Sequence, residues 1–330
     1  QDPGLGGFAY HPALFYSGYR SLPMLSEIPF EVPPYLLDRI EGMDRVRMAI
    51  AGADHPIALK SARQGADAGL IDPVLVGDAD VIRAAAREIE WDITSFAIVD
   101  AVGEEKAPAT AVALARSGEV TSLMKGHLHT DALMKAVVNR EHGLRTSRRL
   151  SHIFHMTVPG NDRVLMITDA AVNVQPDTDT KVDITNNAIA MAHALGNPKP
   201  RVALLSGTES VLPAMPSSVD AAKVVKRANA GEVKNAIVDG PFAFDNALSK
   251  KAAALKGMDG PVAGQADILV VPNIETGNGL FKMMVYFMSG LAAGLVMGAV
   301  VPIVLTSRAD PPEARFAATA IAAIVADANN

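Results

Sequence analysis

The segment Ala266-Asp267-Ile268-Leu269-Val270-Val271-Pro272-Asn273 is a short apolar run that ends in a polar cluster. The run Pro302-Ile303-Val304-Leu305 has the same form and leads into Thr306-Ser307-Arg308-Ala309-Asp310. Short apolar runs that are rich in β-branched residues and bounded by turn signals predict buried strands. In an open α/β sheet, ligands bind outside the carboxyl ends of the strands. We therefore expect the functional residues where these two strands end.

Similar apolar runs alternate with helical patterns along nearly the whole chain. Strands are predicted at residues 45–51, 73–76, 96–99, 122–124, 164–168, 202–206, 236–239, 268–271 and 302–306, and helices at 55–68, 78–90, 180–195, 217–229, 244–255 and 311–326. This alternation, with short connections, predicts mostly parallel sheets that are buried on both faces. A basic stretch from Arg140 to Ser151 divides the series, so we expect a domain boundary there.

Composition narrows the class of protein. The 330 residues suffice for two domains, and 49% hydrophobic against 20% charged residues predicts a large core. A net charge of −6 argues against a nucleic-acid partner. The absence of cysteine excludes a cysteine nucleophile and a thiolate metal site, and it fits the cytoplasm. We interpret residues 1–40, which are rich in proline, glycine and aromatics, as a tail or linker; whether a further domain precedes Gln1 stays open.

One uncharged segment, residues 283–307, is long enough to span a bilayer. Its Gly290, Gly294 and Gly298 have the four-residue spacing of packed membrane helices. Pro302 and the β-branched residues around it argue against a membrane span. We interpret residues 277–298 as a buried helix that turns into a buried strand, and we expect no membrane association.

Two clusters invite a metal site. The first is formed by four histidines, His127, His129, His152 and His155, whose spacing is loose for zinc; we expect no metal there, and their role stays open. The second is formed by four aspartates, Asp169, Asp177, Asp179 and Asp183. Oxygen ligands would suit Mg²⁺, but a solvated acidic loop, with Asp179 capping the next helix, explains most of them. Asp169, with Asn173, is the exception because it directly follows a strand.

The run Thr306-Ser307-Arg308 suits a phosphate, because it joins a hydroxyl and a guanidinium to a predicted helix start. An ordinary helix cap is the alternative interpretation. Asp310 and Glu313 are the nearest carboxylates, and each is a candidate base or a partner of the helix dipole. Lys125 before Gly126 ends another predicted strand, where it can meet an anion as a point charge. The glycine motifs of P-loop and dinucleotide folds are absent from the sequence.

Four segments, in this order, resemble the phosphate acetyl/butyryltransferase family: Ile167-Thr168-Asp169-Ala170-Ala171-Val172-Asn173, Asp239-Gly240-Pro241-Phe242-Ala243-Phe244-Asp245, residues 266–278 and residues 302–310. The resemblance extends from about residue 43 to residue 326. The segment Ser147-Arg148-Arg149-Leu150-Ser151-His152 looks closest to the butyryltransferases and to the phosphotransacetylase half of fusions with an enoyl-CoA-hydratase-like domain.

The resemblance implies a reversible acyl transfer between coenzyme A and phosphate, with acyl-CoA, CoA, inorganic phosphate and acyl phosphate as partners. It implies a ternary complex, no bound cofactor and a homodimer. It also implies two three-layer α/β/α domains of the isocitrate/isopropylmalate dehydrogenase type, with mostly parallel sheets and the active site in the cleft between them. Their expected bounds are residues 41–150 plus 304–330 and residues 151–303. Phosphate acetyltransferase is our first choice and phosphate butyryltransferase the alternative. A Mg-dependent dehydrogenase-like enzyme, which lacks its nucleotide signature here, and a non-catalytic CoA-binding regulator remain further alternatives.

The resemblance also implies site residues. Ser307 would hydrogen-bond the reacting centre and Arg308 would hold the phosphoryl group. The position of the proposed base of the acetyltransferase branch is Ala314 here, so Asp310 or Glu313 takes that role or the base lies elsewhere. Lys125 and Gly126 replace a Ser/Ala-Gly turn of the family, and Lys135 replaces a downstream arginine. The expected substrate- or phosphate-binding residues are Lys125, Gly126, Thr130, Lys135, Asp169, Asn173, Asn278 and Lys282.

Overall fold

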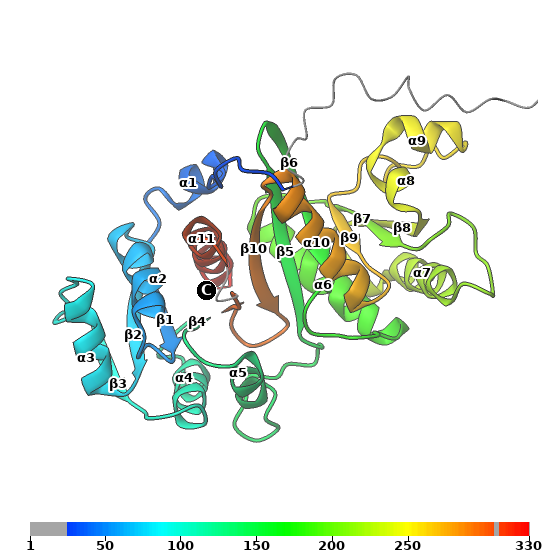
Figure 1. The fold of residues 1–330 in the computed structure, drawn as a ribbon. Helices are drawn as coiled ribbons and strands as arrows, with labels where there is room; N and C mark the ends of the chain where they lie inside the picture. The colour runs from blue at the N-terminus through cyan, green and yellow to red at the C-terminus, as the bar shows by residue number, and fades with distance from the viewer. Residues whose placement is uncertain (1–24, 307–309, 330) are drawn as a thin grey trace, which may run out of the picture.

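A computed structural model describes residues 25–306 and 310–329. The strands within these residues form one sheet in the order β3-β2-β1-β4-β11-β10-β5-β6-β9-β7-β8 (Figure 1). Their bounds are β1 (Val46–Ala51), β2 (Ile71–Gly77), β3 (Ala97–Asp100), β4 (Ser122–Lys125), β5 (Ser151–Val158), β6 (Asn161–Thr168), β7 (Arg201–Leu205), β8 (Ile237–Phe242), β9 (Ile268–Val270), β10 (Leu291–Met297) and β11 (Ile303–Val304).

Helices cover both faces of the sheet. Their bounds are α1 (Pro34–Ile40), α2 (Pro56–Asp67), α3 (Ala79–Glu88), α4 (Lys106–Ser117), α5 (Thr130–Val137), α6 (Thr178–Ala194), α7 (Pro216–Arg227), α8 (Phe244–Leu248), α9 (Lys250–Leu255), α10 (Ile274–Met288) and α11 (Pro312–Ala328), with a π-helical turn at Ala228–Glu232. In Figure 1 the blue and cyan elements form one half and the green and yellow elements the other, while α11 and β10 lie between them. The predicted α/β class with a mostly parallel sheet is confirmed.

The two parallel series run in opposite directions. Strands β3, β2, β1, β4 and β11 are parallel to one another, as are β6, β9, β7 and β8. The antiparallel strands β10 and β5 join them into one sheet, in which Val304, Leu295, Ile153 and Thr168 occupy one row. Strands β11 and β6 therefore run in opposite directions, and their carboxyl ends point away from each other along the strand axis. The division into residues 41–150 plus 304–330 and 151–303 stays a prediction.

The helix expected at residues 277–298 is only half right. Helix α10 ends at Met288, Ser289 adopts the left-handed conformation, and the chain then enters strand β10. Gly294 lies in that strand, where a Cβ atom would come within 2.7 Å of the His152 ring on β5. At Gly294 the small residue therefore serves close packing within a sheet. No helix in the described part of the chain combines the length and apolarity of a membrane span.

Part of the segment that we interpreted as a tail is structured. Helix α1 buries Leu36 completely, and the hydroxyl of Tyr35 hydrogen-bonds Nε2 of His155 on the sheet. Residues 1–24 lie outside the described residues. The helix expected at residues 244–255 is two helices, because Ser249 is extended and caps α9 by accepting the amide of Ala252.

Candidate functional site

A cavity of about 460 Å³ lies where α10 and the start of α5 approach the ends of β4, β5 and β11. Its volume is within the usual range for a small-molecule site. The residues that line it, hereafter the central cavity, are Lys125, Leu128, His129, Thr130, His152, Phe154, Ala171, Asn278, Phe281, Lys282, Leu305, Thr306 and Asp310.

The side of the cavity near β4 suits an anion. Lys125, the last residue of β4, is only 7% exposed, and its Nζ donates two long hydrogen bonds, of 3.4 Å each, to the carbonyl oxygens of Gly126 and Leu128. Thr130 is the first residue of α5, so the positive end of that helix dipole faces the same region. A lysine held beside a helix N-terminus can bind a phosphate or a carboxylate.

Gly126 is required by the backbone around it. A Cβ atom at this position would lie 2.2 Å from the carbonyl oxygen of Gly52. The amides of Gly126 and His127 donate to the carbonyl oxygens of Ala51 and Gly52, each at 2.8 Å. This close pairing fixes the turn that carries Lys125 into the cavity.

The opposite wall is apolar and includes a buried histidine. The rings of Phe154 on β5 and Phe281 on α10 stack with centroids 3.9 Å apart. His152, two residues earlier on β5, is 1% exposed. Burial lowers the pKa of His152, and the charge of Asp169 and a hydrogen bond with the Leu305 backbone offset this only in part. His152 is therefore neutral near pH 7.

A second histidine lies at the rim of the central cavity. His129 precedes α5, and its Nδ1 is 2.6 Å from Oε1 of Glu104. Both side chains are largely exposed, at 71% and 53%. The carboxylate orients the imidazole and leaves its Nε2 as the nitrogen that can meet a ligand.

Asp169 organises the loop that follows β6. Its carboxylate accepts the amides of Ala171, Val172 and Asn173 at 3.0, 3.0 and 3.1 Å and the side-chain amide of Asn173 at 2.6 Å. Asp169 is 1% exposed. With its oxygens engaged in this way, Asp169 fixes the loop whose residue Ala171 lines the central cavity.

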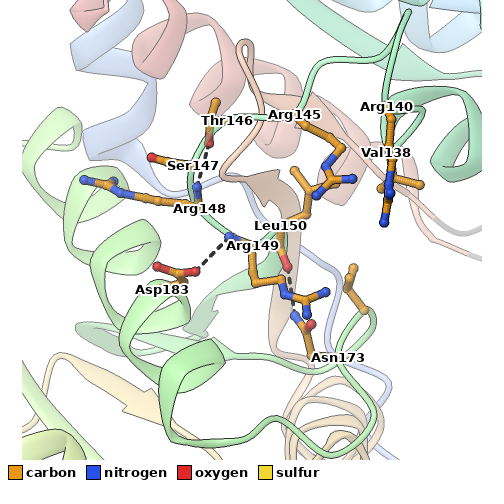
Figure 2. Close-up of a pocket in the computed structure, with 11 residues that line it drawn as sticks. Val138, Arg140, Arg145, Thr146, Ser147, Arg148, Arg149, Leu150, Asn173 and Asp183 are labelled. Atoms are coloured by element: carbon orange, nitrogen blue, oxygen red, sulfur yellow. Dashed lines mark hydrogen bonds between the residues drawn. The ribbon is translucent and has the colours of Figure 1, made fainter.

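A second cavity, of about 560 Å³, adjoins this loop (Figure 2). Ala171 lines the central cavity, whereas the next two residues, Val172 and Asn173, line the second one. The remaining lining residues come from the segment between α5 and β5 and from α6: Val138, Arg140, Arg145, Thr146, Ser147, Arg148, Arg149, Leu150 and Asp183. We call it the arginine cavity.

The structure brings some of the expected site residues together. Lys125, Thr130, Asn278, Lys282 and Asp310 line the central cavity. The others are placed differently: Gly126 supports the turn, Asp169 lies behind the wall, Asn173 faces the arginine cavity, Lys135 is exposed on the last turn of α5 and Glu313 is on the first turn of α11. Ser307 and Arg308 lie outside the described residues.

Several cavity residues were not identified as site residues from the sequence: His129, His152, Phe154, Phe281 and Leu305. The two histidines carried a signal, since they belong to the group that suggested a metal. The aromatic pair carried none, because its members are 127 positions apart and meet only when α10 packs on β5.

Neither cluster that suggested a metal forms one site. His152 and His155 face opposite sides of β5, and the ring of His127 stacks on that of His55 with centroids 3.8 Å apart. Within the described residues, no three histidine or acidic side chains gather as metal ligands would.

The acidic residues after β6 also separate. Asp177, not Asp179, caps α6 by accepting the amide of Thr180 at 2.8 Å. This hydrogen bond is the main reason that the pKa of Asp177 is lowered. Asp179 pairs with Arg227, and Asp183 accepts the amide of Arg149 at 2.9 Å.

Comparison with known proteins agrees with this geometry. Residues 104–323 match the family described as phosphate acetyl/butaryl transferase. A phosphate acetyltransferase of Rhizobium meliloti is 46% identical over 297 residues, which cover 89% of this chain and 94% of that protein. The chain belongs to this family. It is therefore an acyltransferase, and the resemblance seen in the sequence is confirmed.

Two further relatives show the breadth of the family. A phosphate butyryltransferase of Clostridium beijerinckii is 40% identical over 294 residues, which cover 89% of this chain and 97% of that protein. The crystal structure of a branched-chain phosphotransacylase from Enterococcus faecalis V583 superposes with a TM-score of 0.75 at 32% identity, over 85% of this chain and 99% of that one. The fold and the family are thus shared by enzymes whose names specify different acyl groups.

Proposed function

We propose that this acyltransferase is a phosphate acetyltransferase, which converts acetyl-CoA and inorganic phosphate to acetyl phosphate and CoA in the central cavity. Support for the location comes from the two described residues on either side of positions 307–309, because Thr306 and Asp310 both line this cavity. Ser307 and Arg308, the pair that matches the family motif, stand between them in the sequence. This placement is the observation that carries the proposal.

The roles follow from the chemistry of the walls. In the direction that consumes acetyl phosphate, the CoA thiol loses its proton to a base and the thiolate attacks the acetyl carbon. The C–S bond forms as the C–O bond to phosphate breaks. Arg308 and Lys125 hold the departing phosphate, and Ser307 donates to the oxygen on which negative charge develops. Asn278 and Lys282, on α10, face the same cavity and bind the CoA side of the reaction.

We assign the base to Asp310. It lines the cavity, whereas Glu313 is not among the lining residues. Ala314, at the position of the base proposed for the acetyltransferase branch, is 2% exposed in the packed face of α11. A carboxylate at the cavity wall meets the requirement that a general base reach the proton that it removes.

The proposal is tested by CoA release from acetyl-CoA and from butyryl-CoA, each with and without phosphate. Phosphate-dependent release that is faster with acetyl-CoA is expected. Arg308→Ala and Lys125→Gln should each lower kcat/KM about 100-fold, the typical loss for one charge-stabilising group. The control is Lys251→Gln, which removes an exposed positive charge on α9 and should keep full activity.

Faster release with butyryl-CoA would change the assignment to a phosphate butyryltransferase. Release that is independent of phosphate, or no release while CoA still binds, would refute acyl transfer to phosphate. Asp310→Asn separates the base from the binding groups. In the direction that consumes acetyl phosphate it should lower kcat and leave the KM for acetyl phosphate nearly unchanged.

We also infer that the protein is a homodimer that works in the cytoplasm. The outward side of α10 exposes four large side chains in its last two turns, Met283, Tyr286, Phe287 and Met288, each 45–56% exposed. Apolar patches of this kind are typical of protein–protein interfaces. Sedimentation equilibrium should give twice the mass of the chain, and the double variant Met283→Lys/Phe287→Lys should give the monomer.

The absence of cysteine supports the cytoplasm as the compartment.

A further inference from the structure

The arginine cavity concentrates positive charge next to the central cavity. Figure 2 shows that Arg140, Arg145 and Arg149 extend toward the hollow between α5 and the start of β5, while Arg148 extends to the other side of its loop. The only carboxylate among the lining residues is Asp183. In a chain with a net charge of −6, this is a local excess of positive charge.

The guanidinium groups of this cavity are not used in ion pairs within the described residues. Other arginines pair with carboxylates, such as Arg201 with Asp267 at 2.8 Å and Arg63 with Asp67 at 3.2 Å. The carboxylate of Asp183 instead accepts the backbone amide of Arg149. Four guanidinium groups around a hollow whose lining includes one carboxylate repel one another, and a bound anion relieves that repulsion.

The shape and chemistry of the cavity narrow the anion. Arginine binds phosphate through two parallel N–H···O bonds, so several arginines favour a ligand with several phosphate oxygens. The volume of about 560 Å³ is far larger than one phosphate group needs. Val138, Leu150 and Val172 add an apolar part to the wall, against which a flat base can pack.

We propose that the arginine cavity binds a nucleoside phosphate with two or more phosphate groups. Two sources share this chemistry: the 3′-phosphorylated ADP end of CoA, and a free nucleotide that regulates the enzyme. The first source rests on the proposed function. It has geometric support, because Ala171 lines the central cavity while Val172 and Asn173 line the arginine cavity, so the two cavities adjoin the same loop.

The test compares the double variant Arg145→Gln/Arg149→Gln with the control Arg87→Gln/Lys251→Gln. Both lose two exposed positive charges, but Arg87 and Lys251 line neither cavity. The measurements are KM for acetyl-CoA, kcat/KM for acetyl-pantetheine, which has no nucleotide, and calorimetric binding of ADP. Circular dichroism checks the fold of each variant. Arg149→Lys, which keeps the charge but loses the two-pronged geometry, should show part of the effect.

If the cavity holds the nucleotide end of CoA, the double variant raises the KM for acetyl-CoA about tenfold or more and leaves acetyl-pantetheine turnover unchanged. If it holds a free nucleotide, ADP binding is lost while the KM for acetyl-CoA stays constant. Unchanged KM and unchanged ADP binding relative to the control overturn the proposal. Wild-type protein that turns over neither thioester refutes the proposed function alone, because ADP binding still tests the cavity.

Discussion

Replacing Gly294 by alanine tests the packing that connects the sheet to the central cavity. An alanine Cβ at this position in β10 would lie 2.7 Å from both Cε1 and Nε2 of His152 and 3.2 Å from Cε1 of Phe154. Side-chain carbon atoms in folded proteins do not approach so closely. Because His152 is 1% exposed and lines the central cavity, its ring can make room for the methyl group only by displacing other side chains or by moving into that cavity.

The expected cost follows from this overlap. Adding a methyl group to a packed core typically destabilises a protein by about 1–3 kcal/mol. We expect a loss in the upper half of that range, because the neighbouring ring lies on the same buried sheet. Activity should also fall, since His152 and Phe154 both line the cavity. Gly279→Ala on α10 is the matched control: nothing lies within 4 Å of its Cβ, and it should be neutral or stabilise by up to about 1 kcal/mol.

Urea unfolding of four proteins measures the effect: wild type, Gly294→Ala, His152→Ala and the double variant. If the clash is with the imidazole ring, Gly294→Ala lowers the free energy of unfolding only slightly when His152 is already alanine. The losses of unfolding free energy in the two single variants then do not add up to the loss in the double variant. Additive free energies would show that the ring is not what alanine meets. A Gly294→Ala protein with wild-type stability and activity would refute the packing argument altogether.

Three further predictions concern stability. Lys181 is about 5% exposed and pairs with Asp220 at 3.1 Å. Asp220→Ala should lower the free energy of unfolding in urea by about 3 kcal/mol, because it leaves a buried ammonium unpaired. The control Lys223→Ala removes an exposed partner of the same carboxylate and should cost under about 1 kcal/mol. Burial lowers the pKa of His155 to about 4, below its value near 6.5 in the unfolded chain. Between pH 4 and pH 6.5 the unfolded state therefore binds more protons than the folded state. The free energy of unfolding should fall by about 3 kcal/mol as the pH drops from 6.5 to 4. A stability profile of His155→Gln that keeps the full slope would contradict this assignment. Asp169→Asn leaves at least one amide of its loop without an acceptor, so it should lower the free energy of unfolding by about 1–3 kcal/mol. It should also slow the enzyme. Wild-type kinetics in this variant would show that the loop does not shape the site.

The sequence predicted the elements whose pattern is local. Strands such as β1, β2, β6 and β9 are short apolar runs between turn signals, and helices such as α6 and α11 carry their own periodicity. Ordered motifs also identified the family and included Asn278 and Asp310, and the end of a predicted strand singled out Lys125. All three residues line the central cavity. Local pattern and motif order require no knowledge of which segments meet in space.

The tertiary structure decided what depends on distant partners. Strand β5 carries two buried histidines and β10 is rich in glycine and alanine, so neither has the appearance of a central strand until Gly294 admits His152. These two antiparallel strands reverse the direction of one half of the sheet, and Asn173 lines the arginine cavity whereas Thr306 lines the central cavity. The aromatic wall and the arginine cavity arise from the same long-range packing. Such contacts depend on how well the surfaces of segments that are distant in the sequence fit together. The hydrophobic pattern of each segment does not say which other segment it will contact.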